Sequence, residues 1–176
     1  MTGPYSSLYG PTDVPHTLRT RIGFRQLEER LAQRGRLELK DLQQLAFANR
    51  VYAAELILPE LLPHCTRNDD RLIADACRVL TNWDRRAELD SRGAVLFREF
   101  WNRAASMIKL WRTPFDPREL LAALREAAHA VQVVGIALDA SLGELQSEAR
   151  QGQRARSTAR LAISTARTIR SICTRT

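Results

Sequence analysis

The chain has 176 residues and a net charge of +7, with 44% hydrophobic and 27% charged residues. This length and composition fit one globular domain and exclude a disordered chain. No run of residues approaches the about 18 apolar positions of a membrane-spanning helix. The N-terminal segment has neither the basic start nor the apolar centre of a signal peptide. We therefore expect neither a membrane-spanning helix nor a signal peptide in this sequence.

The positive charge is concentrated at the C-terminal end. Residues 147–176 contain seven arginines and one acid, a net charge of +6, which leaves about +1 for the rest. The segment is a low-complexity mixture of Arg, Ser, Thr, Ala and Ile. We interpret it as a disordered or irregular tail, out of register with the gene that encodes the body, as after a shifted reading frame. It lacks aromatic residues for stacking on bases, so a solvated end is favoured over a nucleic-acid partner.

The N-terminal third of the chain predicts a loose lead-in followed by two helices. Residues 1–16 hold three prolines and two glycines, which is typical of extended or irregular structure. Apolar side chains then recur at helical spacing over residues 18–34 and again over about 40–58. Pro59 and Pro63 are expected to end the second of these helices.

Two further helices are predicted in the middle of the chain. The third helix begins near Asn68 or Asp69, either of which is a good N-cap. The fourth helix is capped by Asp90 or Ser91, and its apolar stripe reaches Trp111. A glycine in the first turn of that helix, Gly93, lowers helix propensity and indicates close approach of another backbone or a loose start.

The clearest boundary starts the last predicted helix. Asp116 is suited to the N-cap position and Pro117 to the first helical position, and the helix should stop near Gly135. Five helices and no convincing strand predict a mainly α fold, with residues 17–146 as the helical segment.

The cysteines and the charged linker offer two possible sites. Three cysteines without a CxxC spacing argue against a disulfide framework or a zinc site, and Cys77 fits a buried thiol on an apolar stripe. The linker between the third and fourth helices alternates acids with arginines. Its acids could bind a divalent cation, but mutual ion pairing is the simpler interpretation. The linker's charged residues are Asp84, Arg85, Arg86, Glu88, Asp90 and Arg92.

Nucleophilic catalysis is not indicated by the remaining polar residues. The three histidines, His16, His64 and His129, fall in separate elements, and none is placed beside a serine or cysteine with an orienting acid. Phosphate-binding and nucleophile-elbow motifs are not found in the sequence. We therefore expect no cofactor and no metal site in this segment.

An ordered series of segments resembles the β-chain of the penicillin acylase (penicillin amidase) family, and in particular the branch of acyl-homoserine-lactone and aculeacin-type acylases. The likeness covers roughly residues 15–146. The segments that carry it are 49–56 (NRVYAAEL), 80–84 (LTNWD), 89–101 (LDSRGAVLFREFW), 115–117 (FDP), 135–139 (GIALD) and 142–146 (LGELQ).

The resemblance implies an N-terminal-nucleophile amidohydrolase with an αββα core. Such enzymes cleave themselves into α and β chains, and the serine at the new β-chain N-terminus attacks an amide carbonyl with its own α-amino group as base. An asparagine side chain and a backbone N–H stabilise the oxyanion. The family's substrates are acyl amides such as penicillins, N-acyl-homoserine lactones used in quorum sensing, and acylated peptide antibiotics. Intact members are periplasmic or secreted.

The sequence departs from the family pattern at the nucleophile. None of its serines has the family's setting, in which a glycine precedes the nucleophile and an asparagine follows it; these serines include Ser6, Ser7, Ser91 and Ser106. One functional position carries over from the resemblance. The family has an active-site arginine at the head of a helix shortly before the segment that matches residue 49. Arg21 is the best match and Arg19 the second.

Three functions remain open. The first is a β-chain segment of an acylase, the helical part of its αββα fold, which is inactive by itself because the nucleophile, the α-chain and the rest of the β-chain are missing. The second is a small basic helical module that binds nucleic acid or an acidic partner through its arginine-rich tail. The third is a separate subunit that pairs with a polypeptide carrying the nucleophile.

Overall fold

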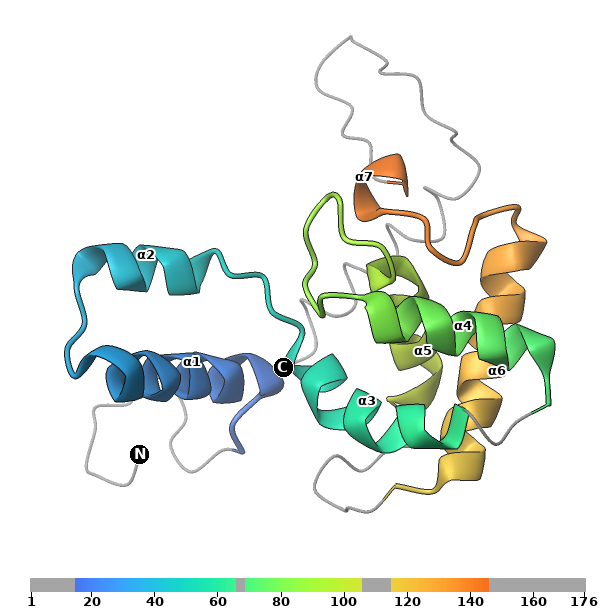
Figure 1. The fold of residues 1–176 in the computed structure, drawn as a ribbon, viewed down its shortest axis with the longest axis horizontal. Coiled ribbons are helices and arrows are strands. Elements are labelled where there is room, and N and C mark those ends of the chain that lie inside the picture. Colours follow the sequence, from blue (N-terminus) through green and yellow to red (C-terminus); the bar gives the residue numbers. More distant parts are fainter. Residues whose placement is uncertain (1–14, 66–68, 106–114, 146–176) are drawn as a thin grey trace, which may run out of the picture. The chain divides into compact units, whose positions relative to one another are not determined.

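The computed structural model describes residues 15–65, 69–105 and 115–145. Within these ranges the chain forms seven helices and no strand, apart from one isolated antiparallel bridge between Arg92 and Ser141 (Figure 1). The prediction of a mainly α protein is confirmed, with a helix count slightly above the expected five. The predicted lead-in and tail fall largely outside the described residues.

The described helices belong to two compact units, residues 1–53 and 54–176. None of these helices is long and apolar enough to cross a membrane. The first unit contains α1 and α2, and the second contains nearly all of α3 together with α4 to α7.

The first helix, α1 (Leu18–Arg34), has the bounds that the sequence predicts. Thr17 caps it, because its hydroxyl oxygen accepts a hydrogen bond of 3.2 Å from the N–H of Thr20. Gly35 ends the helix in a left-handed conformation, with φ of 71°, and its N–H donates to the carbonyl of Leu31 at 2.7 Å. Local capping signals therefore fix both ends.

The second predicted helix is in fact two helices. α2 covers Leu39–Ala46 and α3 covers Tyr52–Cys65, so the expectation of one helix over residues 40–58 is wrong. Asn49 lies between them with φ of 47°, a conformation that a continuous right-handed helix cannot contain. Asparagine tolerates this conformation better than most residues, which explains why the break occurs there.

The expectation that two prolines end this helix is also wrong, because Pro59 and Pro63 both lie inside α3. A proline removes one backbone donor from a helix and tends to kink or break it. Here the neighbouring side chains Ile57, Leu58 and Leu61 are completely buried. The packing of these apolar residues outweighs the missing hydrogen bonds.

A buried carboxylate joins α1 to α2. The side chain of Asp41 is almost inaccessible to solvent, and its Oδ1 lies 3.1 Å from Nη1 of Arg34 and 3.6 Å from Nη1 of Arg30. The other carboxylate oxygen accepts the backbone N–H of Glu38 at 3.1 Å, which caps α2. A buried charge is tolerated only with such partners, so the α1–α2 hairpin depends on this polar contact.

The second unit is built around three packed helices, α4 (Arg71–Asn82), α5 (Ala94–Ala104) and α6 (Pro117–Val133), with the short α7 (Leu142–Leu145) following (Figure 1). Burying apolar area is the main favourable term in folding. The buried side chains of these three helices are Ile73, Ala76, Cys77, Leu80, Ala94, Val95, Leu96, Phe97, Phe100, Ala104, Leu120, Ala123, Leu124, Ala127, Ala128 and Val131.

The start of α4 differs from the prediction, because the N-cap is Asp70 and not Asn68 or Asp69. One carboxylate oxygen of Asp70 accepts the N–H of Leu72 at 2.8 Å, and the other accepts Nε of Arg125 from α6 at 2.7 Å. The Arg125 guanidinium holds the pKa of Asp70 below its ordinary value. This contact from α6 selects Asp70 as the cap, and sequence alone does not reveal it.

The start of α5 depends on a tryptophan and a glycine. Gly93, rather than Asp90 or Ser91, is the N-cap, with φ of 113°. A Cβ on Gly93 would lie 2.8 Å from Cβ of Trp83, closer than side chains approach one another. The expected close approach of another backbone at this glycine is wrong, because the nearest atoms belong to the side chain of Trp83. Trp83 is buried, and its indole N–H donates to the carbonyl of Arg86 at 2.9 Å.

The start of α6 confirms its prediction. Asp116 is the N-cap and accepts the N–H of Arg118 at 2.8 Å, with Pro117 at the first helical position. The chain leaves the helix near Gly135, which has φ of 78°. Of the predicted fourth-helix stripe, Trp111 lies outside the described residues.

The expectation of free cysteines is wrong, because Cys65 and Cys77 form a disulfide bond. Cys77 is buried, as predicted, but its sulfur is bonded to the last residue of α3. Three cysteines without a CxxC spacing disfavour a disulfide framework, but they do not exclude a single bridge between two consecutive helices. The bond closes a loop with a sequence separation of 12 residues and ties α3 to α4.

Reducing this bond should lower the free energy of unfolding by about 3 kcal/mol, because the unfolded chain regains the entropy of a short closed loop. We expect dithiothreitol to lower the urea midpoint of a Cys173→Ser protein, monitored by tryptophan fluorescence. A variant that also carries Cys65→Ala and Cys77→Ala serves as control and should not respond to the reductant. Equal midpoints with and without reductant in the Cys173→Ser protein would contradict the assignment.

Replacing Gly93 by alanine should destabilise the second unit by about 2–4 kcal/mol, because left-handed strain and a clash with Trp83 act together. The matched control is Gly135→Ala. Gly135 also has a positive φ, but no atom lies within 4 Å of an added Cβ, so strain alone should cost about 1 kcal/mol. Urea unfolding of the two variants measures the difference, and equal losses would show that Trp83 does not press on Gly93.

Candidate functional site

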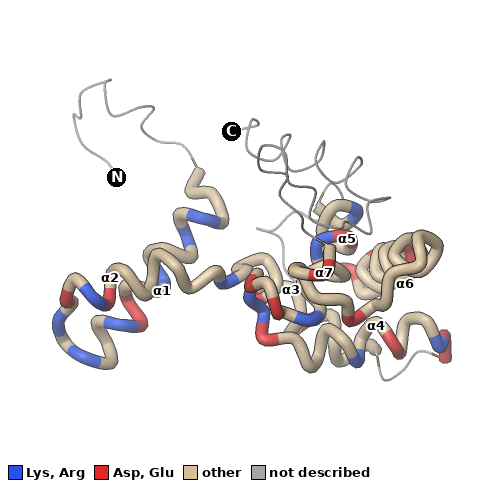
Figure 2. The backbone as a smooth tube through the Cα atoms, turned by 90° about the horizontal axis from the view of Figure 1, so that it is seen from above, with Lys and Arg blue, Asp and Glu red and all other residues tan. Residues whose placement is uncertain are grey.

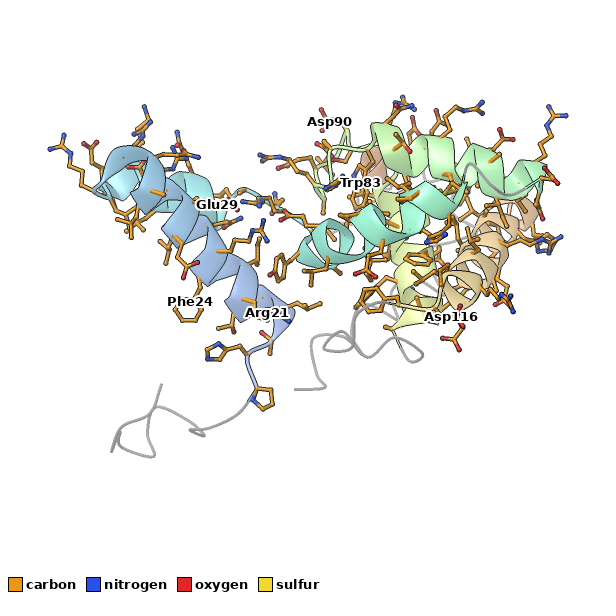
Figure 3. The ribbon with its side chains drawn as sticks, turned by 60° about the horizontal axis from the view of Figure 1, so that its bottom comes forward. Arg21, Phe24, Glu29, Trp83, Asp90 and Asp116 are labelled. Atoms are coloured by element: carbon orange, nitrogen blue, oxygen red, sulfur yellow. A yellow bond between two sulfur atoms is a disulfide. The ribbon has the colours of Figure 1, made fainter. Side chains whose placement is uncertain are left out.

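The candidate active-site arginine, Arg21, lies in the first turn of α1 and is exposed. Its guanidinium carbon is 5.6 Å from the ring centroid of Tyr52, and that of Arg25 is 5.9 Å from the same ring. A cation over an aromatic face is attracted by the ring's quadrupole, so Tyr52 favours one position of the Arg21 head group. Figure 3 shows Arg21 projecting from α1 together with Phe24 and Glu29.

Glu29 is held between two arginines next to this pair. Its Oε2 accepts from Nη1 of Arg50 at 2.6 Å, and its Oε1 accepts from Nε of Arg25 at 2.8 Å. The hydrogen bond from Arg50, followed by that from Arg25, lowers the pKa of Glu29 from 4.5 to about 2. Glu29 is therefore ionised at neutral pH, and it fixes Arg25 against the ring of Tyr52.

These residues surround an open hollow of about 750 Å³ on the first unit. Aromatic side chains line it beside the charged ones, and the ring of His16 packs on that of Phe24 with centroids 5.5 Å apart. The hollow combines guanidinium donors with aromatic surface, so it can accept a group that carries negative charge next to an apolar part. Its lining residues are His16, Arg21, Phe24, Arg25, Glu28, Glu29 and Tyr52.

Arg19, the second match to the family arginine, is also on α1 and exposed, but it does not line the hollow. Sequence reasoning did not identify Tyr52, Arg25 or Glu29 as neighbours of Arg21. The spacing of Arg25 and Glu29, four residues apart on a helix, signals their ion pair. Tyr52 falls within the range predicted as one continuous helix, about residues 40–58, and the helix in fact breaks at residue 49, before Tyr52.

The charged linker before α5 is organised by hydrogen bonds. The hydroxyl of Ser91 donates to Oδ1 of Asp84 at 3.2 Å and accepts the N–H of Glu88 at 3.2 Å. Arg92 pairs with residues outside the linker, with Nη1 3.8 Å from Oδ2 of Asp139 and Nη2 3.6 Å from Oε1 of Glu144. The expectation of ion pairing within the linker is therefore wrong for Arg92, because its partners come from the turn after α6 and from α7.

The other candidate residues that the structure describes are not among the lining residues of this hollow, apart from His16. His64 is in the last turn of α3, and His129 is exposed on α6. Ser91 is committed to the linker, and Ser6, Ser7 and Ser106 lie outside the described residues. In the part of the chain that the structure describes, no three His, Cys, Asp or Glu side chains gather into a possible metal site.

A second hollow, of about 490 Å³, lies on the second unit between α4 and the turn after α6. Both of its arginines have carboxylate partners, since Arg78 pairs with Asp75 at 2.8 Å and Arg92 pairs with Asp139. These pairs use part of the hydrogen-bonding capacity that an anionic ligand would need. The exposed first hollow is the better candidate site.

Comparison with known proteins adds an independent finding. The model of the penicillin amidase family matches residues 2–172, which extends beyond the residues that carried the resemblance. Aculeacin-A acylase of Actinoplanes utahensis is 38% identical over 109 residues, which cover 54% of this chain and 14% of the relative. The acyl-homoserine lactone acylase PvdQ of Pseudomonas fluorescens strain Pf0-1 is 31% identical over 120 residues, covering 68% and 15%.

A second relative aligns over more of the chain. The acyl-homoserine lactone acylase PvdQ of Pseudomonas fluorescens strain Pf-5 is 28% identical over 171 residues, covering 85% of this chain and 22% of the relative. The chain thus spans between 14% and 22% of the length of these curated relatives.

The ion pairs of Glu29 predict the pH at which its carboxyl group titrates. A carboxyl whose pKa is lowered on folding stabilises the folded state above its ordinary pKa of 4.5, and that stabilisation is lost as the pH falls toward 2. Arg50→Gln removes the larger cause, so the carboxyl titration of Glu29, followed by ¹³C NMR, should move upward toward 4.5. Arg36→Gln is the control, since Arg36 pairs with Glu38. A Glu29 midpoint that is the same in both variants would contradict the network.

Proposed function

Because the chain belongs to the penicillin amidase family, we propose that it is the helical part of the β-chain of an N-terminal-nucleophile amidohydrolase. The whole protein would hydrolyse the acyl amide bond of a substrate such as a penicillin, an N-acyl-homoserine lactone or an acylated peptide. This proposal is supported by the family match, by relatives named as acylases, and by the exposed position of Arg21 on a hollow.

Arg21 is the residue that we propose to act in the site. Attack on an amide carbonyl develops negative charge on its oxygen, and fixed cationic or N–H donors stabilise that charge strongly. The guanidinium of Arg21 is always protonated and is positioned over the ring of Tyr52. We propose that it supports the oxyanion, while the serine nucleophile and the asparagine come from parts of the polypeptide beyond these 176 residues.

The observation that carries the proposal is the joint position of Arg21, Tyr52 and Glu29. An arginine that acted only as a helix-start surface charge would need no aromatic platform and no ion-paired neighbour. The charged linker before α5 then has a structural role. Its hydrogen bond from Ser91 to Asp84 and its ion pair from Arg92 to Asp139 join residues that are far from Arg21 in the sequence. The alternative of a nucleic-acid-binding tail rests on residues outside the described ranges, and no contact among the described residues favours it.

The 176-residue chain by itself should not hydrolyse a chromogenic fatty-acyl or phenylacetyl amide, because none of its serines has the setting of the family's nucleophile. Release of the chromophore measures turnover directly. Turnover that is abolished by a serine-directed inhibitor and absent from a mock preparation would show that the chain holds a complete catalytic apparatus, contrary to the proposal.

The role of Arg21 can be tested in a chimera, in which the chain replaces the 171 matching residues of PvdQ from strain Pf-5. In an active chimera, Arg21→Ala should lower kcat for a fatty-acyl amide by roughly 100- to 1000-fold, as expected for loss of an oxyanion donor. Arg19→Ala is the matched control, two residues away on the same helix, and should change kcat by less than about threefold. Equal effects of both substitutions would overturn the assignment of Arg21.

A further inference from the structure

The α1–α2 hairpin has an inverted pattern of burial. Among the described residues 15–53, the buried side chains are Gln26, Asp41 and Ala53, so two of the three are polar. Helices ordinarily bury their apolar stripe and expose their polar one. Five large apolar side chains of the hairpin are instead exposed, and the others are half-buried. The exposed ones are Phe24 at 46%, Leu31 at 43%, Leu39 at 72%, Leu42 at 44% and Phe47 at 77%.

Four of these exposed residues share one side of the hairpin. Residues advance by about 100° around a helix, and the line along which α1 meets α2 runs through Gln26, Arg30 and Arg34. Phe24 and Leu31 lie roughly 100–120° to one side of that line.

On α2, Asp41 faces α1, and Leu42 and Leu39 lie roughly 100° and 160° from it in the same rotational sense. The two helices lie side by side and are joined by a short turn, so they run antiparallel (Figure 1). In an antiparallel pair, flanks of the same rotational sense fall on one face. Phe24, Leu31, Leu39 and Leu42 therefore form a single apolar face.

The other flank of the hairpin carries its charged side chains together with Leu18 and Ile22, which are half-buried. Glu29 on α1 lies on that side and is bonded to Arg25 and Arg50, and Lys40 occupies the matching flank of α2. The two faces thus differ in their exposed side chains, which are apolar on the first face and charged on the second. Arg21 lies at the border of the apolar face, because it lines the same hollow as Phe24.

Residues 15–53 carry eight basic and four acidic side chains, a net charge of +4. Figure 2 shows Lys and Arg positions along both helices and their connecting turn. An exposed apolar face with a basic surround fits a partner surface that is apolar at its centre and acidic at its rim.

We propose that the apolar face of the α1–α2 hairpin is the docking surface for the nucleophile-bearing part of a penicillin-amidase polypeptide. The chain spans between 14% and 22% of its relatives, so most of the family polypeptide lies beyond these residues and is available to cover the face. Docking there places Arg21 at the edge of the interface, where a site built from both parts would lie. This inference rests on the proposed function and adds the surface by which the site is assembled.

The test compares two cysteine variants on one helix, Leu42→Cys on the apolar face and Lys40→Cys on the opposite flank. Both are made in a Cys173→Ser background, in the 176-residue chain and in the PvdQ chimera. A maleimide reagent should label both thiols rapidly in the chain alone. In the folded, monomeric chimera, the Leu42→Cys thiol should react at least about tenfold more slowly, and the Lys40→Cys thiol should change by less than about twofold.

The possible outcomes separate docking from function. Equal labelling of the two thiols in the chimera, whether both fast or both slow, overturns the docking surface. Slow labelling of the Leu42→Cys thiol in the chain alone overturns it as well, because the face would then be covered from within. Protection of Leu42→Cys in a chimera without acylase turnover supports docking but contradicts the proposed function. Acylase turnover without protection of the Leu42→Cys thiol supports the proposed function but overturns the docking surface.

Discussion

The second unit depends on the contact between Trp83 and Gly93. The buried indole occupies the space where any other residue would carry its Cβ, and its ring packs on Phe97 with centroids 5.1 Å apart. Phe97 in turn lies 5.7 Å from Phe100, inside the packed α4, α5 and α6 helices. This chain of aromatic contacts turns a charged linker into a defined connection between two helices.

The first unit is held together by a different kind of interaction. Asp41 joins α1 to α2 by ion pairs, and the hairpin has no apolar interior among its described residues. Buried ion pairs stabilise less than buried apolar area, because the charges must first lose their water. Arg21, the proposed functional residue, is thus carried by the part of the chain that gains least from its own packing. A site that is completed by another part of a larger enzyme would have this property.

The sequence predicts those features that depend on neighbouring residues in the chain. The bounds of α1, the cap at Asp116 and the glycine that follows α6 all come from local signals. The break at Asn49 was missed because the apolar period continues through it. Other features need contacts between distant elements, such as the choice of Asp70 as a cap by Arg125 and the bond from Cys65 to Cys77.

The residues of the candidate site likewise divide into one that the sequence reveals and others that need contacts between distant elements. Arg21 was found through its place in an ordered family pattern, whereas its neighbour Tyr52 became visible only once the break in the helix was known. The most direct test of the whole account is native-state amide hydrogen exchange of the 176-residue chain, followed by mass spectrometry of peptides. Amides of α4, α5 and α6 should exchange at least about 100-fold more slowly than those of α1 and α2. Equal protection of both units would contradict the proposal that the hairpin is completed by another part of the polypeptide.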